Sequence, residues 1–253
     1  MELSSQQIER YSRHIMLNQI GLTGQKKLMM SKVLIIGTGG LGSPCAMYLA
    51  AAGVGTIGIA DADVVDLSNL QRQIIHSTNN LGREKVQSAK ETILSINPDV
   101  TVKTYNIYVN DVNIAKIIEE YDFIVDCTDN FTSKFLISDA CVLAKKPFSH
   151  AGINGFQGQL MTYVPRKSPC YRCIFKNPPE EEVNSEEKKI GIVGAMAGVI
   201  GSLQAMEAIK YITSVGELLI GCILTYNALD MEFRKVKLPK SMKKCAVCSK
   251  VDL

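Results

Sequence analysis

Long hydrophobic runs, an excess of charge of one sign and an export signal are all missing from this sequence of 253 residues. The apolar runs, such as Val33 to Ile36, are far shorter than a bilayer span. The segment Met1-Glu2-Leu3-Ser4-Ser5 lacks the basic and then apolar layout of a signal peptide. Lys and Arg outnumber Asp and Glu by only 28 to 25, which gives no footprint for nucleic acid or an anionic membrane. We therefore expect a cytoplasmic protein that binds neither of them.

Histidine is scarce as well. The chain has three, His14, His76 and His150, and none has the spacing of a metal-ligand pair. Such residues are more typical of the surface or of hydrogen-bonded core positions than of catalysis. With 46% hydrophobic residues the chain is long enough to bury a large core, and we expect one domain over residues 1–253.

Cysteine, in contrast, has a specific arrangement. Four of the eight cysteines form two pairs with two-residue gaps, Cys170-Tyr171-Arg172-Cys173 and Cys245-Ala246-Val247-Cys248. Without an export signal, metal ligation explains these pairs better than disulfides, core thiols or a redox couple. Two such pairs supply the four soft ligands of a closed tetrahedral site, which leaves no open position for catalysis. We predict that Cys170, Cys173, Cys245 and Cys248 bind a structural Zn²⁺.

Predicted strands and helices alternate through the first 150 residues. This order favours a doubly wound, mostly parallel α/β sheet of the Rossmann-like kind. After a helical arm over residues 1–30, the pattern predicts strands at 33–36, 56–60, 100–105, 123–126 and near Phe148, with helices beginning at Ser43 as N-cap and at 83–95 and 131–143.

The pattern changes after residue 150. An alternating strand over 160–164 and two more strands over 222–226 and 231–237 indicate an antiparallel C-terminal part, and a long core helix is predicted over 196–212. Residues 176–189 are rich in glutamate and lysine and indicate a surface loop. We expect residues 31–150 to form a nucleotide-binding half and residues 151–253 a carrier-binding, zinc-bearing half.

A glycine-rich turn, Gly37-Thr38-Gly39-Gly40-Leu41-Gly42, follows the first predicted strand. In a phosphate-binding turn the first glycine allows the bend, the second lets backbone N–H groups approach phosphate, and the third admits close helix packing. The motif alone is a weak signal, since a simple structural turn has the same composition. Asp61, at the end of the next strand, is placed to accept a hydrogen bond from a ribose hydroxyl of ATP or NAD. An NAD-dependent dehydrogenase is therefore an alternative.

Residues further along favour nucleotidyl transfer. Asp63, Asn69, Arg72 and Lys85 follow in a polar segment and the next helix, and two cations near the glycine turn suit a triphosphate that loses pyrophosphate. The segment Cys127-Thr128-Asp129-Asn130 lies at the end of a predicted strand, where open α/β sheets bind ligands. Asp129 is well placed there to hold Mg²⁺.

Together these motifs closely resemble the ThiF/MoeB/HesA family, relatives of the ubiquitin-activating enzymes. The resemblance covers nearly the whole chain and is carried by Arg10-Tyr11-Ser12-Arg13, the Gly37 to Gly42 turn, Asp61-Ala62-Asp63, Leu67-Ser68-Asn69-Leu70-Gln71-Arg72-Gln73, Lys85, Asp126-Cys127-Thr128-Asp129-Asn130, the two cysteine pairs and Gly201-Ser202-Leu203-Gln204-Ala205-Met206-Glu207.

The resemblance implies an enzyme that binds ATP and Mg²⁺ and adenylates the C-terminal glycine carboxylate of a ubiquitin-like sulfur carrier of the ThiS or MoaD type. Such carriers end in Gly-Gly and serve thiamine, molybdopterin or related biosynthesis. Arg72 and Lys85 would bind phosphates and developing charge, and Asp129 the metal. Family members are homodimers, so Arg13 is the candidate for a contact with the partner's site. Other implied nucleotide-binding residues are Gly37, Gly39, Gly40, Gly42, Asp61, Asp63, Ser68, Asn69, Gln73 and Asn130.

One departure from the family concerns the crossover loop, where some members carry a cysteine. The segment Asn184-Ser185-Glu186-Glu187-Lys188-Lys189 has none, so we expect a separate sulfur donor and no covalent carrier adduct at this loop. Cys127 is nearest the predicted nucleotide, but a cysteine at a strand end is usually an inert packing residue. A scaffold that binds nucleotide and carrier without turnover is the remaining alternative.

Overall fold

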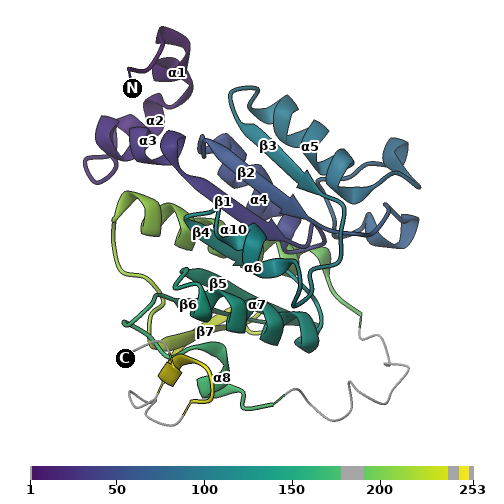
Figure 1. The fold of residues 1–253 in the computed structure, drawn as a ribbon. Helices are drawn as coiled ribbons and strands as arrows, with labels where there is room; N and C mark the ends of the chain where they lie inside the picture. The colour runs from purple at the N-terminus through teal and green to yellow at the C-terminus, as the bar shows by residue number, and fades with distance from the viewer. Residues whose placement is uncertain (1, 178–190, 239–244, 251–253) are drawn as a thin grey trace.

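The computed structural model describes residues 2–177, 191–238 and 245–250. In these residues one eight-stranded sheet has the order β3-β2-β1-β4-β5-β6-β7-β8 (Figure 1). The neighbours from β3 to β5 pair in parallel, and those from β5 to β8 pair antiparallel, which confirms the predicted fold class. The strands are β1 Lys32–Ile36, β2 Thr56–Ala60, β3 Thr101–Tyr105, β4 Phe123–Asp126, β5 Phe148–Asn154, β6 Gln157–Tyr163, β7 Cys222–Asn227 and β8 Glu232–Lys237.

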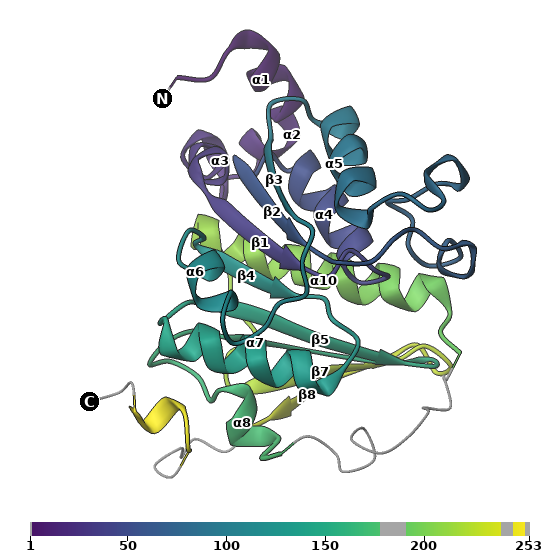
Figure 2. The ribbon, with the colours of Figure 1, turned by 45° about the vertical axis from the view of Figure 1, so that its right-hand side comes forward.

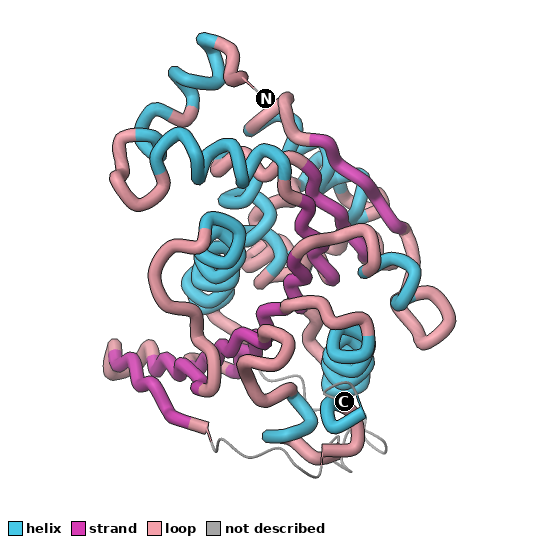
Figure 3. The backbone as a smooth tube through the Cα atoms, turned by 60° about the vertical axis from the view of Figure 1, so that its left-hand side comes forward, coloured by secondary structure: helices cyan, strands magenta, loops and turns pink. Residues whose placement is uncertain are grey.

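Helices cover both faces of this sheet. On one face α4 contacts α5 and α10, and α10 also packs on β4, β5 and β6; on the other face α7 contacts α6, α8, β4 and β5. Figures 2 and 3 show the sheet between these two layers. The helices are α1 Ser5–Arg10, α2 Ser12–Ile15, α3 Gly21–Met30, α4 Gly42–Ala51, α5 Lys85–Ile96, α6 Ile114–Ile118, α7 Phe131–Leu143, α8 Tyr171–Ile174 and α10 Gly194–Thr213.

Strand β1 is buried on both faces. Val33 and Ile35 belong to the core beneath α4 and α10, whereas Leu34 and Ile36 belong to the core beneath α6 and α7. A continuous apolar run is therefore the expected sequence for this central parallel strand. Strand β8 lies at the far edge of the sheet, and all of its residues are exposed.

The strand order reverses beside β1. The chain runs from β1 outward to β2 and β3, and then crosses over to place β4 on the other side of β1. The C-terminal ends of β1 and β4 are therefore neighbours, and the register pairs Ile36 with Asp126. Ligands of open α/β sheets bind at such a reversal because the loops leaving the two strands diverge there.

The predicted boundaries hold with local corrections. Helix α4 begins directly from the glycine turn at Gly42, so Ser43 is not its N-cap; the Ser43 hydroxyl instead donates to the Gly39 carbonyl at 2.7 Å. Strand β6 begins at Gln157 rather than at Leu160, because β5 and β6 form a hairpin that turns at Gly155 with φ +57°. The short helices α6 and α8 were not predicted.

Most of the predicted surface loop over 176–189, including the crossover segment Asn184 to Lys189, lies outside the described residues. Among the helices of the described ranges, none combines the length and the apolar character that crossing a bilayer requires.

Candidate active site and metal centre

The glycine turn leaves β1 and lies directly against the segment that leaves β4. Gly37 has φ +92°, and a Cβ built on it would lie 2.8 Å from the Cys127 carbonyl oxygen. A Cβ on Gly42 would lie 2.0 Å from the Gly37 carbonyl oxygen. At Gly39 the nearest atom to such a Cβ is Gln73 Nε2 at 3.5 Å, which is an ordinary contact. Gly37 and Gly42 are therefore required by the fold, whereas the fold leaves space beside Gly39.

Asp61 fixes the glycine turn from β2. Its Oδ2 accepts hydrogen bonds from the Thr38 backbone N–H at 2.7 Å and from the Thr38 hydroxyl at 2.9 Å, and its Oδ1 accepts from the Asp63 N–H at 2.9 Å. This carboxylate therefore stands beside the turn, where the sequence predicts a ribose acceptor, and it also organises the turn itself.

His76 also forms a hydrogen bond with this turn. It is buried, with Nε2 3.1 Å from the Thr38 carbonyl oxygen and Nδ1 2.9 Å from the Ser88 hydroxyl. Because a carbonyl only accepts, Nε2 carries the proton and Nδ1 accepts from Ser88. Burial lowers the pKa of His76, so the neutral ring is favoured. The sequence predicts a surface histidine or a hydrogen-bonded core histidine, and His76 is a core histidine that links the glycine turn to Ser88 of α5.

Arg72 lies along the glycine turn. A Cβ on Gly40 would lie 3.5 Å from Arg72 Cγ, and the guanidinium donates to the Ser68 carbonyl at 3.1 Å. Asn69 accepts a 2.9 Å hydrogen bond from the buried Gln73 amide. Asn69 also donates to the Ser68 hydroxyl at 3.0 Å. The structure therefore brings the predicted residues of this segment together beside the turn.

Lys85 begins α5 and forms an ion pair with Asp63. The distance from Lys85 Nζ to Asp63 Oδ2 is 2.7 Å, and only 5% of the lysine side chain is exposed. Tyr108 donates to the other Asp63 oxygen at 3.1 Å. Burial alone would raise the pKa of Asp63, but these two partners outweigh it and lower the pKa. The carboxylate therefore stays ionised and holds the ammonium group in place.

The segment after β4 carries Asp129 and Asn130. Asp129 is exposed, and the Asn130 side chain caps α7 by accepting from the Ser133 N–H at 2.8 Å. An exposed carboxylate at a strand end suits a hard cation such as Mg²⁺, which prefers oxygen ligands. Neighbouring Cys127 is buried, and burial raises the pKa of its thiol well above the usual range, as expected of an inert packing residue.

Arg13 is the one predicted catalytic residue that lies elsewhere. It is exposed on α2, two residues from Tyr11. The Tyr11 hydroxyl accepts from Asn97 at 2.8 Å, just before β3, and its ring packs against Gly53, just before β2. Arg13 therefore lies near the N-terminal ends of the parallel strands, whereas the glycine turn lies at their C-terminal ends (Figure 1).

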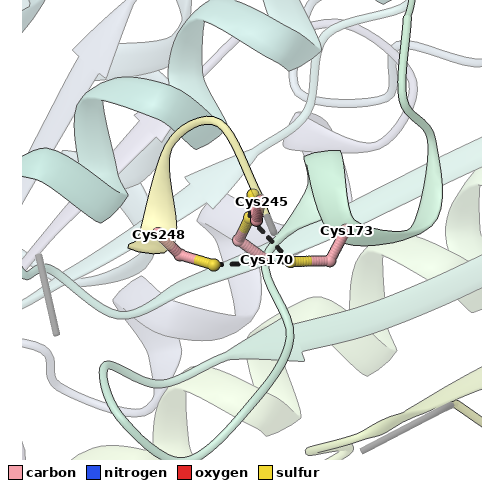
Figure 4. A group of neighbouring side chains, drawn as sticks. All are labelled: Cys170, Cys173, Cys245 and Cys248. Atoms are coloured by element: carbon pink, nitrogen blue, oxygen red, sulfur yellow. Dashed lines mark hydrogen bonds between the residues drawn. The ribbon is translucent and has the colours of Figure 1, made fainter. Parts of the chain in front are cut away.

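The two cysteine pairs meet although 71 residues separate Cys173 from Cys245 in sequence. The four sulfur atoms lie within 4.8 Å of one another, with Sγ–Sγ distances of 3.4 Å for Cys170–Cys173, 3.6 Å for Cys170–Cys245 and 3.4 Å for Cys173–Cys248 (Figure 4). All four are free thiols. This cluster joins the segment beside α8 to the short helix Cys248–Lys250 near the C-terminus.

The geometry of this cluster fits zinc. A tetrahedral ion with Zn–S bonds of about 2.3 Å separates its sulfur ligands by about 3.8 Å, close to the distances present. The hydrogen bond from Cys173 lowers the pKa of Cys170, because it stabilises the thiolate that a metal ion requires. Four sulfur ligands complete a tetrahedron, so a bound ion would hold structure and leave no position for substrate.

Several residues that support the site carry no signal in the sequence. Asp126 and His150 form a buried pair beneath the Asp129 segment, Lys134 lies beside them, and Tyr108 supports the Asp63–Lys85 ion pair. Their residue types give no motif in sequence. Asp126 belongs to one of the segments that carry the family resemblance, but its burial and its partner on the next strand depend on the order of the strands.

This chain is similar to known proteins over nearly its whole length. The model of the ThiF family matches residues 11–247. Among curated relatives, the chain is 45% identical over 246 residues to "Adenylyltransferase and sulfurtransferase MOCS3-1" of Zea mays, covering 97% of this chain and 53% of that protein. It is 42% identical over 247 residues to the MOCS3 protein of Xenopus laevis, covering 98% and 55%. The chain thus spans about half the length of these relatives.

Solved structures agree with the fold. Escherichia coli MccB in complex with MccA-N7isoASN superimposes with a TM-score of 0.85 at 26% identity, covering 98% of this chain and 75% of MccB. MccB with ATP gives a TM-score of 0.82 at 26% identity, covering 94% and 73%. The family match over residues 11–247, together with identities of 42–45% to curated relatives, shows that this chain belongs to the ThiF family.

Proposed function

We propose that this chain transfers AMP from ATP to the C-terminal glycine carboxylate of a ubiquitin-like sulfur carrier. The observation that carries the proposal is the contact between the turn after β1 and the segment after β4, with Gly37 against the Cys127 backbone and Arg72 along Gly40. This contact supports the proposal, because the residues predicted to bind phosphate, ribose and metal follow the C-terminal ends of neighbouring strands. The names of the curated relatives, which include adenylyltransferase and sulfurtransferase, support the reaction class.

The reaction joins two anions. A carboxylate oxygen of the carrier forms a bond to the α-phosphorus, and the bond from that phosphorus to the bridging oxygen breaks. Pyrophosphate leaves with the electron pair, and the carrier ends in a mixed anhydride with AMP. Since both reactants are negatively charged, the protein must align them and offset their repulsion.

The residues at the sheet edge suit these tasks. Arg72 and Lys85 bind the phosphates, Asp61 binds the ribose, and Asn69 and Gln73 orient the phosphate chain. Gly39 and Gly40 let the backbone approach the phosphates, with Ser68, Asp63 and Asn130 completing the binding site. Asp129 holds Mg²⁺, which would neutralise phosphate charge.

Lys85 needs no large movement to take part. An ammonium group has three donors, and Asp63 uses one of them within the described part of the chain. Asp63 thus orients the Lys85 ammonium group while the remaining donors serve phosphate. The ion pair also lowers the cost of keeping the charged lysine almost fully buried before nucleotide binds.

The partners follow from the same proposal. A carrier tail ending in Gly-Gly has no side chains to obstruct its approach to the α-phosphate. The chain acts as a homodimer in which Arg13 enters the partner's site, consistent with its place at the opposite edge of its own sheet. A separate protein donates sulfur to the activated carrier, in a pathway of the thiamine, molybdopterin or related kind. Zinc in the cysteine cluster stabilises the C-terminal part.

Exchange of labelled pyrophosphate into ATP tests the proposal. We expect exchange that requires a carrier with a free Gly-Gly terminus and that falls roughly 100-fold in Arg72→Ala and in Asp129→Ala. Arg83→Ala is the matched control, because Arg83 forms an exposed ion pair with Glu91 and should leave the rate unchanged. Carrier-independent exchange, or equal exchange in all three variants, would reject the proposal.

A further inference from the structure

A buried network lies beneath the segment that carries Asp129. Asp126 is fully buried at the end of β4, and its Oδ1 accepts from the Thr128 N–H at 3.0 Å and from the Thr128 hydroxyl at 2.6 Å. Its Oδ2 lies 2.8 Å from Nδ1 of His150, the residue opposite it on β5. A carboxylate only accepts, so His150 Nδ1 donates.

The carboxylate stays ionised in this position. Burial alone would raise the pKa of Asp126, but the Lys134 ammonium 3.7 Å away and the hydrogen bonds from His150 and Thr128 lower it to about 2. Lys134 is itself held by a 2.7 Å hydrogen bond to the Ala151 carbonyl. An ionised acceptor makes stronger hydrogen bonds than a neutral one, so Asp126 fixes Thr128 firmly, one residue before Asp129.

His150 also contacts the residue that follows the first cysteine of the cluster. Its ring packs against Tyr171 with centroids 4.4 Å apart, and Tyr171 is fully buried between Cys170 and Arg172. Tyr171 is held in turn between Phe135 at 4.8 Å and Phe175 at 4.7 Å. No described residue forms a hydrogen bond with the buried His150 Nε2. The buried ring thus contacts Asp126 at the end of β4 and Tyr171 at the start of α8.

We propose that His150 is a positioning residue that couples the cysteine cluster to the Asp129 segment. Metal in the cluster fixes the chain on both sides of Tyr171, Tyr171 fixes the His150 ring, and His150 fixes Asp126 and thereby Thr128. The inference rests on the proposed function for the role of Asp129, whereas the coupling itself is a property of the fold. Loss of the metal then loosens the segment after β4 and weakens binding of MgATP.

Two substitutions separate the two contacts of His150. His150→Asn keeps an amide donor near the Nδ1 position but removes the ring that meets Tyr171. His150→Phe keeps a ring against Tyr171 but removes the donor to Asp126. Thr162→Val is the matched control, because it deletes a buried 2.5 Å hydrogen bond to Glu207 of α10, the helix that covers the sheet face opposite α7.

The experiment compares zinc-loaded protein with the same protein after chelation. Calorimetry gives the dissociation constant of MgATP, and hydrogen exchange gives the protection of residues 127–130 without nucleotide. In the wild type and in Thr162→Val we expect chelation to weaken MgATP binding at least about fivefold, which is the lower end of typical coupling between sites. Chelation should also speed hydrogen exchange of residues 127–130. In His150→Asn, which lacks the ring contact with Tyr171, MgATP should bind about as weakly with zinc present as it does to the chelated wild type, and chelation should change its dissociation constant less than twofold.

His150→Phe should bind MgATP weakly with and without zinc, because Asp126 loses its donor in both states. Tyr171→Leu serves as a second uncoupling variant should His150→Asn fail to fold. A full chelation response in His150→Asn or Tyr171→Leu, or none in the wild type, overturns the coupling. If the hydrogen-exchange data show the coupling but pyrophosphate exchange does not depend on a carrier, the proposed function alone is rejected.

Discussion

Two alanine substitutions in the glycine turn should separate folding from nucleotide binding. A Cβ at position 42 would lie 2.0 Å from the Gly37 carbonyl oxygen, and this backbone atom cannot move aside as a flexible side chain would. A Cβ at position 39 would meet only Gln73 Nε2, at 3.5 Å. Gly42→Ala should therefore damage the fold, whereas Gly39→Ala should fold normally and place a methyl group where backbone must approach phosphate.

The magnitudes follow from these contacts. Overpacking a tight site costs about 1–3 kcal/mol, and a backbone clash of this depth belongs at or above the upper end. For a domain of this size, about 3 kcal/mol corresponds to a fall in melting temperature of roughly 6–12 °C. Gly39→Ala adds an ordinary contact and lies outside the positive-φ region, so its stability should change by less than about 1 kcal/mol.

Thermal unfolding and ATP titration of both variants provide the assay. We expect Gly42→Ala to melt well below the wild type, and Gly39→Ala to melt like the wild type but to bind MgATP at least about tenfold more weakly, a loss of about 1.4 kcal/mol. The reasoning is refuted if Gly42→Ala keeps the wild-type melting temperature, or if Gly39→Ala binds MgATP as tightly as the wild type.

Three further predictions concern zinc, pH and the dimer. Cys248→Ser should lose the bound zinc in elemental analysis and melt earlier, whereas Cys141→Ala, which alters a buried cysteine outside the cluster, should retain a full equivalent; equal zinc in both would contradict the assignment. Because the folded pKa of His76 lies below its unfolded value of about 6.5, the unfolded state binds more protons, and the urea midpoint should fall as pH decreases below about 6.5. His76→Gln, whose amide can still donate to Thr38, should reduce this slope, and an unchanged slope would exclude His76 as its source. Mixing Arg13→Ala with Asp129→Ala chains should restore up to about a quarter of wild-type exchange, because half of the random dimers carry one intact site; no recovery would indicate that Arg13 does not act in trans.

Much of the architecture could be predicted from local patterns. The apolar run at Val33 to Ile36 and the helix over 131–143 depend on side chains close in sequence, so their boundaries could be read directly. The glycine turn is contiguous, and its steric demands at Gly37 and Gly42 are the same in any chain that folds this way. The cysteine spacing likewise predicted four ligands at one point, since each pair already brings two thiols together.

Other features depended on which strand lies beside which. Asp126 and His150 are 24 residues apart, and only the crossover that places β4 between β1 and β5 makes them partners. Lys134 on α7 is buried, which is rare for a lysine, and its ammonium group lies 3.7 Å from the Asp126 carboxylate. A sequence specifies periodicity and local bends by itself. The ionised state of Asp126, the hydrogen bonds of His76 and the separation of Arg13 from the glycine turn of its own chain arise from tertiary contacts, because burial and charge depend on neighbours brought together by folding.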